Sequence, residues 1–265
     1  MDSARQNLLL YAGISAIIVV GIGYLLVNNV FATSALYNQT ISSSQLSALS
    51  TIANNQSLAE TVGVNAYIGL NGSAYITNIT GSPLIYNGKP EILYVGAEFC
   101  PYCAASRWAL ILALMRFGNF TGLKYSASSS TDVYPSTPTF SFVNSTFTSS
   151  YLSFNAFETE TRTGQPLMSL DPISQNVFTR YGNAIPFSDF GNTYVESGSI
   201  TVPSIYQNLQ WGTIISDLSL PATQVSQATV GSANIYTAEI CAAINNTAPV
   251  CGQEYVKAAR DKFLT

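Results

Sequence analysis

The chain has 265 residues, of which 47% are hydrophobic and only 9% are charged, and its net charge is −4. This length and hydrophobic content suffice for one large packed domain or two modest ones, so a disordered chain is excluded. The slight acidic excess leaves no surplus of Lys and Arg for a nucleic-acid partner. With so few ionisable groups, uncharged polar residues must cover the surface, which suits a protein outside the cytoplasm, for instance at low external pH.

The sequence contains no histidine, and its four cysteines fall into two local pairs. Without histidine there is no Ser–His–Asp triad, no Cys–His protease pair and no His-containing metal site. Most hydrolase functions are therefore excluded. An even number of cysteines in the local pairs Cys100/Cys103 and Cys241/Cys251 fits an oxidising compartment, with one pair redox-active and the other structural.

Residues 8–27 form a run of twenty residues without a charge, which is long enough to span a bilayer. The run is longer than the apolar region of most cleavable signal peptides, although residues 31–35 could be a cleavage site. We therefore expect residues 1–35 to hold one retained transmembrane helix. The positive N-terminus and Arg5 predict a single-pass protein of the cell membrane whose body faces the extracytoplasmic side.

Residues 36–87 are expected to be a juxtamembrane region. Apolar spacing over residues 41–58 predicts a short helix. Between residues 69 and 89, turn signals separate short apolar runs and predict hairpin strands, the signals being Asn71-Gly72, Gly81-Ser-Pro83 and Asn87-Gly88.

The continuous apolar run at residues 91–97 predicts a central strand that is buried on both faces. It leads directly into Cys100-Pro-Tyr-Cys103 and then into an apolar helix, for which Gly118 is the expected end. Unpaired N–H groups and the positive end of the helix dipole stabilise a thiolate at a helix start. Cys100 is therefore the candidate nucleophile.

Later segments complete an α/β pattern. Strands are predicted at residues 123–127, 139–143 and 151–158, with a polar loop at 128–138, and a helix is predicted at 172–181. Residues 184–196 predict a hairpin with a Gly-Asn turn.

The C-terminal part, residues 201–265, predicts a helical extension. A short helix is expected at residues 211–218, and a longer one from Pro221 as its first residue to Ile244. A disulfide between Cys241 and Cys251 would join two helical segments and contribute on the order of 3 kcal/mol.

Cys-x-x-Cys has three meanings in proteins: a redox dithiol, half of a zinc site, or an inert bridge. Zinc would need Cys241 and Cys251 as further ligands, and their spacing of ten is unlike that of structural zinc sites. The preceding strand and the following helix favour the redox dithiol, and we expect no metal.

The segment Ala97-Glu-Phe-Cys-Pro-Tyr-Cys103 resembles the active-site stretch of the thioredoxin superfamily, with the Pro-Tyr dipeptide of glutaredoxins. More specifically, residues 94–118, 132–138 and 185–192 resemble the DUF929 family of membrane-anchored thioredoxin-like proteins, over roughly residues 88–251. The resemblance implies a fold and a dithiol but no substrate.

Thioredoxin-like proteins also place a cis-proline opposite the dithiol, before the last hairpin. Pro186 fits this position and would line the substrate groove. Pro203 is the rival, but it lacks the following strand and turn. An ordinary trans proline remains an alternative at both positions.

Several charged residues near the motif have modest expected roles. Glu98 could relay protons or simply be a solvated residue at a strand end. Arg107, one helical turn after Cys103, is expected only to cap the helix surface. Glu158 and Glu160 are expected to lie on the solvent-exposed face of a strand.

The sequence contains seven Asn-x-Ser/Thr sites, a mild excess over the roughly four expected by chance. This excess fits a surface-exposed glycoprotein. The candidate glycosylation sites are Asn38, Asn55, Asn71, Asn78, Asn119, Asn144 and Asn245.

These patterns predict an α/β protein with one N-terminal transmembrane helix and a C-terminal helical extension. The resemblance implies that residues 88–200 form a thioredoxin-like domain with an insertion. The predicted function is thiol–disulfide exchange, in which Cys100 attacks and Cys103 resolves the mixed disulfide. No cofactor is expected, and the partner would be a protein dithiol or disulfide substrate or a membrane redox protein. The alternative is a non-catalytic accessory or structural subunit of a membrane or cell-surface complex.

Overall fold

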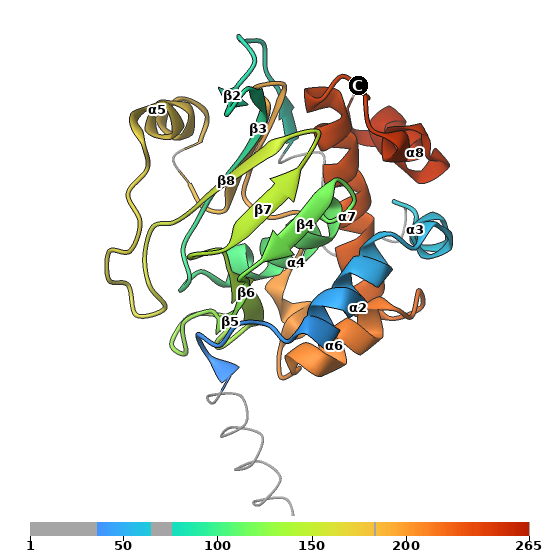
Figure 1. Cartoon of the computed structure of the whole chain (residues 1–265). Helices are drawn as coiled ribbons and strands as arrows, with labels where there is room; N and C mark the ends of the chain where they lie inside the picture. Colours follow the sequence, from blue (N-terminus) through green and yellow to red (C-terminus); the bar gives the residue numbers. More distant parts are fainter. Residues whose placement is uncertain (1–35, 65–75, 183, 265) are drawn as a thin grey trace, which may run out of the picture. The chain divides into compact units, whose positions relative to one another are not determined.

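The computed structural model describes residues 36–64, 76–182 and 184–264 (Figure 1). The predicted membrane anchor at residues 8–27 lies outside these ranges. Among the helices that are described, none has both the length and the apolar character needed to cross a membrane. From Asn38 onward the chain forms one compact unit, and the architecture below refers to it.

A mixed sheet forms the centre of the unit, and β3 (Lys89–Gly96) is its middle strand (Figure 1). Residues 91–96 are all buried because β8 (Ser153–Glu158) pairs with β3 in parallel on one side and β9 (Phe187–Phe190) pairs antiparallel on the other. The predicted hairpin is present, since β9 pairs with β10 (Tyr194–Ser197). The prediction of a buried central strand is confirmed.

Helices cover both faces of this sheet. Leu93 and Val95 of β3 belong to an apolar cluster against which Val177 and Phe178 of α5 (Pro172–Tyr181) pack. Tyr94, which points to the opposite face, lies beneath Arg107 of α4 (Pro101–Leu114). On that face α4 also contacts α7 (Gln224–Ala243). Strand β3 therefore carries alternate side chains into two different cores.

Helix α4 begins at the dithiol motif, with Cys100 as its N-cap and Pro101 as its first residue. It ends at Leu114, and Gly118 opens strand β4 (Gly118–Thr121) rather than ending the helix, which corrects the prediction. A Cβ at Gly118 would lie 2.2 Å from the carbonyl oxygen of Thr148 on the paired strand. The glycine is thus required by a close strand contact.

The insertion between α4 and β8 contains two small antiparallel sheets. One pairs β4 with β7 (Thr146–Ser149), and the other pairs β5 (Lys124–Ala127) with β6 (Pro138–Ser141). The β4–β7 pair was not predicted, because each strand has one aromatic residue among polar ones. These two aromatic side chains, Phe120 and Phe147, pack against each other with ring centroids 4.9 Å apart.

The prediction of hairpin strands is confirmed at the Asn87-Gly88 turn, across which β2 (Ile85–Tyr86) pairs antiparallel with the start of β3. Strand β1 (Ile76–Asn78) pairs with β10, and β1 and β2 do not pair with each other. Strands of two or three residues gain little from pairing with each other. Each is instead stabilised by a longer strand of the main sheet.

The single helix predicted near the membrane is two helices, α2 (Ser43–Ala53) and α3 (Gln56–Val62). The break occurs because the Asn55 side chain accepts a hydrogen bond from the Leu58 N–H at 3.0 Å and caps α3.

The C-terminal helices follow the predicted order. Helix α6 (Trp211–Leu218) has the predicted bounds. Helix α7 begins after Thr223, whose hydroxyl accepts the Ser226 N–H at 3.1 Å, so Pro221 is not its first residue. Cys241 of α7 forms a disulfide with Cys251 in the turn η3 (Pro249–Gly252), ahead of α8 (Glu254–Phe263). The turn η2 (Pro203–Tyr206) precedes α6.

Besides Glu158, four carboxyl groups are buried in this core, and in the described part of the chain none of these four forms an ion pair: Glu91, Asp189, Glu196 and Glu239. Burial raises the pKa of Asp189 to about 7 and that of Glu196 to about 8. It also raises the pKa of Glu239, whose two oxygens have no hydrogen-bond partner among the described residues. These groups are therefore neutral at acid pH.

We expect this protein to be more stable at acid than at alkaline pH. The folded state keeps protons that the unfolded chain releases above its ordinary carboxyl pKa, about 4. The free energy of unfolding is thus largest below that value, and it falls by several kcal/mol as the pH rises to 8, because each pKa unit of difference between the folded and unfolded states corresponds to about 1.4 kcal/mol. Glu239→Gln should flatten this dependence and raise stability at pH 8. Urea denaturation of the full chain from pH 4 to 9 measures the free energy of unfolding of the wild type and the variant.

The control for this experiment is Glu254→Gln, which removes an exposed carboxylate at the start of α8. An equal effect of Glu239→Gln at pH 4 and pH 8 would show that Glu239 does not carry the pH dependence.

Candidate dithiol site

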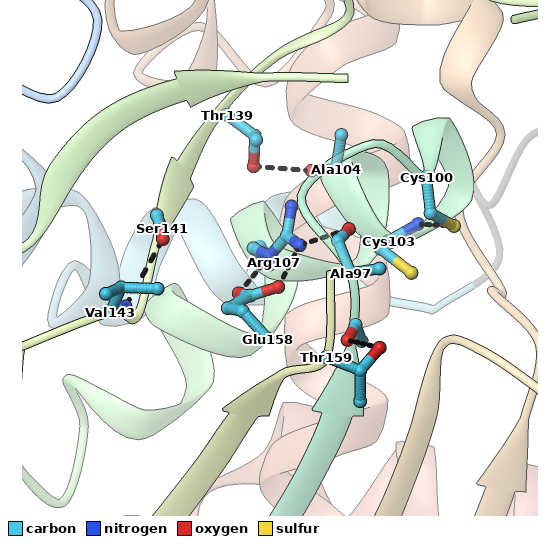
Figure 2. Close-up of polar contacts among 11 residues, drawn as sticks. Ala97, Cys100, Cys103, Ala104, Arg107, Thr139, Ser141, Val143, Glu158 and Thr159 are labelled. Carbon is cyan, nitrogen blue, oxygen red and sulfur yellow. Dashed lines mark hydrogen bonds and ion pairs between the residues drawn. The ribbon is translucent and has the colours of Figure 1, made fainter. Parts of the chain in front are cut away.

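The two thiols of the motif lie together at the start of α4 (Figure 2). The Cys103 N–H donates a hydrogen bond to Cys100 Sγ at 3.1 Å, and Cys103 is fully buried while Cys100 is 6% exposed. Ala97 completes an apolar cluster with the cysteines, and Phe99 and Ile185 pack against it. Cys100 is therefore the more accessible thiol, although its access is narrow.

The pKa values of the two thiols move in opposite directions. The hydrogen bond from the Cys103 side chain lowers the pKa of the Cys100 thiol most, and the Cys103 N–H and the Arg107 charge add to the effect against burial. Burial, with the hydrogen bond to Cys100, raises the pKa of the Cys103 thiol well above its ordinary value. This arrangement favours a thiolate on Cys100 and a thiol on Cys103.

Arg107 and Glu158 form a buried ion pair behind the dithiol (Figure 2). Arg107 Nε donates to Glu158 Oε1 at 2.8 Å, and Nη2 donates to Glu158 Oε2 and, at 2.7 Å, to the carbonyl oxygen of Ala97. Both side chains are fully buried. The predictions that Arg107 only caps the helix surface and that Glu158 lies on the solvent-exposed face of its strand are therefore wrong. The reason is that the start of α4 lies directly against the end of β8.

Tyr94 of β3 lies next to this ion pair. The Arg107 guanidinium lies 5.9 Å from the centroid of the Tyr94 ring. The Tyr94 hydroxyl is buried, and neither it nor Arg107 Nη1 has a hydrogen-bond partner among the described residues. A Cβ at Gly96 would lie 2.3 Å from this hydroxyl oxygen, so glycine there makes room for the tyrosine. Burial raises the pKa of Tyr94 well above its ordinary value and keeps it neutral.

The peptide bond between Ile185 and Pro186 is cis, and Pro186 is buried immediately before β9. Since Ile185 packs against the cysteine cluster, this bond lies close to the dithiol. Pro203 begins the turn η2, and its preceding bond is not among the cis bonds of the described chain. A role of Pro186 in binding substrate stays a prediction.

The remaining predicted residues have other partners or lie at the surface. Cys241 and Cys251 are joined to each other, so they do not supply the two further ligands that a zinc site would need. Glu98 is half-buried, and its N–H donates to the Glu160 carbonyl oxygen at 2.9 Å. Of the candidate glycosylation sites, Asn71 lies outside the described residues and the others are exposed.

A cleft of about 630 Å³ lies beside the motif. It is lined by residues 129–133 of the polar loop, by Glu160 and residues 162–164 after β8, and by Phe99. In the sequence this loop is recognisable only by its turn-forming residues. Its position beside the cysteines depends on contacts between segments that are distant in the chain.

The family described as "Domain of unknown function (DUF929)" has a model that matches residues 75–179. The match supports the family resemblance, and it includes the dithiol, Arg107 and Glu158 but ends before Pro186. Neither the curated proteins nor the solved structures contain a match to this chain.

We expect the charge of Arg107 to contribute to the reactivity of Cys100, in addition to the hydrogen bonds from Cys103. Arg107→Met removes a positive charge that lowers the pKa of Cys100, so alkylation at pH 7 should slow several-fold. It also leaves Glu158 buried and unpaired, which should cost about 3–5 kcal/mol of stability. Rates of iodoacetamide alkylation against pH and urea denaturation measure the two effects.

The double variant Arg107→Met/Glu158→Leu separates these effects. It should recover much of the lost stability, because no unpaired charge remains, but not the reactivity of Cys100. A double variant that is no more stable than Arg107→Met would contradict a coupled pair.

Proposed function

We propose that this chain is a membrane-anchored, extracytoplasmic thiol–disulfide oxidoreductase with a thioredoxin-like fold. The observation that carries the proposal is the position of Cys100 as N-cap of α4, where its sulfur accepts the Cys103 N–H at 3.1 Å. A helix start stabilises a thiolate through its free N–H groups and its dipole. The anchor rests on the charge-free run at residues 8–27.

The arrangement of elements supports the thioredoxin-like part of the proposal. Strand β3, helix α4 and the parallel strand β8 form a β-α-β unit with the insertion on its connection, and Cys-x-x-Cys opens its helix. The cis bond before Pro186 lies at the start of the antiparallel hairpin. These features agree with what the family resemblance implies.

The proposed reaction proceeds in two exchanges. The Cys100 thiolate attacks one sulfur of a substrate disulfide, so that the substrate S–S bond breaks, a mixed disulfide forms and one substrate thiolate leaves. Cys103 then loses its proton and attacks Cys100 Sγ, which releases the second substrate thiolate and leaves a Cys100–Cys103 disulfide. The substrate gains two electrons and the dithiol loses two. A partner dithiol or a membrane redox protein returns them, so no cofactor is needed, and the reverse sequence would oxidise a substrate dithiol.

A second candidate function is that of a non-catalytic subunit of a membrane or cell-surface complex. The observation that favours it is the burial of both thiols, since even Cys100 is only 6% exposed. A dithiol that no substrate can reach serves only as part of the core.

Trapping distinguishes the two functions. We expect Cys103→Ser in the full-length protein to accumulate a stable mixed disulfide through Cys100, because the resolving thiol is absent, and Cys100→Ser to accumulate none. Non-reducing gels and mass spectrometry of membranes measure the adducts. If Cys103→Ser traps nothing and the Cys100 thiol titrates at an ordinary pKa, the enzymatic proposal is wrong and the structural function is supported.

A further inference from the structure

The cleft beside the motif begins one side chain away from the proposed nucleophile. Phe99 lines the cleft and also packs against the cluster that contains Cys100. The cleft's volume, about 630 Å³, lies within the range of sites that bind ligands. A substrate whose disulfide reached Cys100 would thus place its neighbouring atoms at or in this cleft.

The polar loop that forms one wall is fixed at several points. The Ser129 N–H donates to the Phe99 carbonyl oxygen at 2.8 Å, which ties the loop to the motif. From the opposite wall, Arg162 Nε donates to the Ser128 carbonyl oxygen at 2.8 Å and Nη2 donates to Ser136 Oγ at 3.0 Å. The rings of Tyr134 and Tyr102 also meet edge to face, 5.9 Å apart. The cleft is therefore preformed.

The cleft offers hydrogen-bond acceptors and negative charge. Asp132 and Glu160 line it, and in the part of the chain that the structure describes neither forms an ion pair. Arg162, the one cation of the lining, donates from two nitrogens to the fixed loop. Hydroxyl groups of Ser and Thr cover much of the remainder, and Val133 is 68% exposed at its rim. This surface suits a chain with amide donors and a cationic side chain.

We infer that the cleft binds the polypeptide segment next to the substrate's disulfide, with a Lys or Arg side chain facing Asp132 and Glu160. The inference rests on the proposed function, because it assigns the substrate of that dithiol. A small disulfide would react without filling the cleft. A disulfide with carboxylate groups would meet like charges there.

Exchange kinetics with three disulfides test the inference on the full-length protein. One is hydroxyethyl disulfide, which is small and neutral, and the others are two peptides that differ in having Lys or Glu beside the disulfide. The wild type should react about fivefold faster with the Lys peptide than with the Glu peptide at low salt, and the difference should shrink at 0.5 M salt because exposed charges are screened.

The decisive variant is Asp132→Asn/Glu160→Gln, which should abolish the preference between the peptides and leave the rate with hydroxyethyl disulfide unchanged. Its matched control is Glu254→Gln/Asp261→Asn, which removes the same charge from exposed positions on α8 and should keep the preference. Ser130→Trp, which places a large ring in the cleft, should slow both peptides but not hydroxyethyl disulfide.

The outcomes separate the inference from the proposed function. If the wild type shows no preference, if the double variant keeps it, or if Ser130→Trp leaves the peptide rates unchanged, the cleft is not the binding site, although exchange at Cys100 stands. If wild type fails to react with hydroxyethyl disulfide, or if the reaction survives in Cys100→Ser, the proposed function itself is overturned.

Discussion

The ion pair between Arg107 and Glu158 is the interaction on which the dithiol site depends. It joins α4 to the end of β8, and a further bond to the Ala97 carbonyl oxygen fixes the residue from which the motif begins. Burying two charges is costly, and an apolar pair of similar size is often as stable. What an apolar pair could not provide is a positive charge near two thiols in a medium where charge is weakly screened. The pair therefore combines structural order with control of thiol chemistry.

Local patterns predicted the elements around the site well. The apolar run of β3, the cap at Cys100 and the bounds of α5 and α6 each depend on residues that are close in sequence, and all are present. The partner of Arg107 could not be predicted in this way, because Glu158 lies 51 residues later and becomes its neighbour only when β8 pairs with β3. The cleft has the same origin, since one wall is the loop between β5 and β6 and the other is the segment after β8.

The protein uses its few charges unevenly. Burial raises the pKa of Asp189, Glu196 and Glu239 and so favours their neutral forms, whereas the thiol of Cys100 is moved toward its charged form. The same low-dielectric interior has opposite effects because Cys100 has donors and a nearby cation, and the three carboxyl groups have no ion-pair partner in the described structure. The pH of the surroundings therefore acts on stability and on thiol reactivity in opposite directions. Alkaline pH favours the Cys100 thiolate but lowers the stability of the folded state.

The disulfide between Cys241 and Cys251 bears on how this chain acquires the right cysteine pairing. Its partners are ten residues apart, while Cys100 and Cys103 lie more than a hundred residues earlier. Closing a loop of ten residues costs less chain entropy than closing one of more than a hundred. During oxidative folding the C-terminal cysteines should thus find each other before either meets the motif. The short spacing therefore favours the pairing of Cys241 with Cys251 over any pairing with the motif.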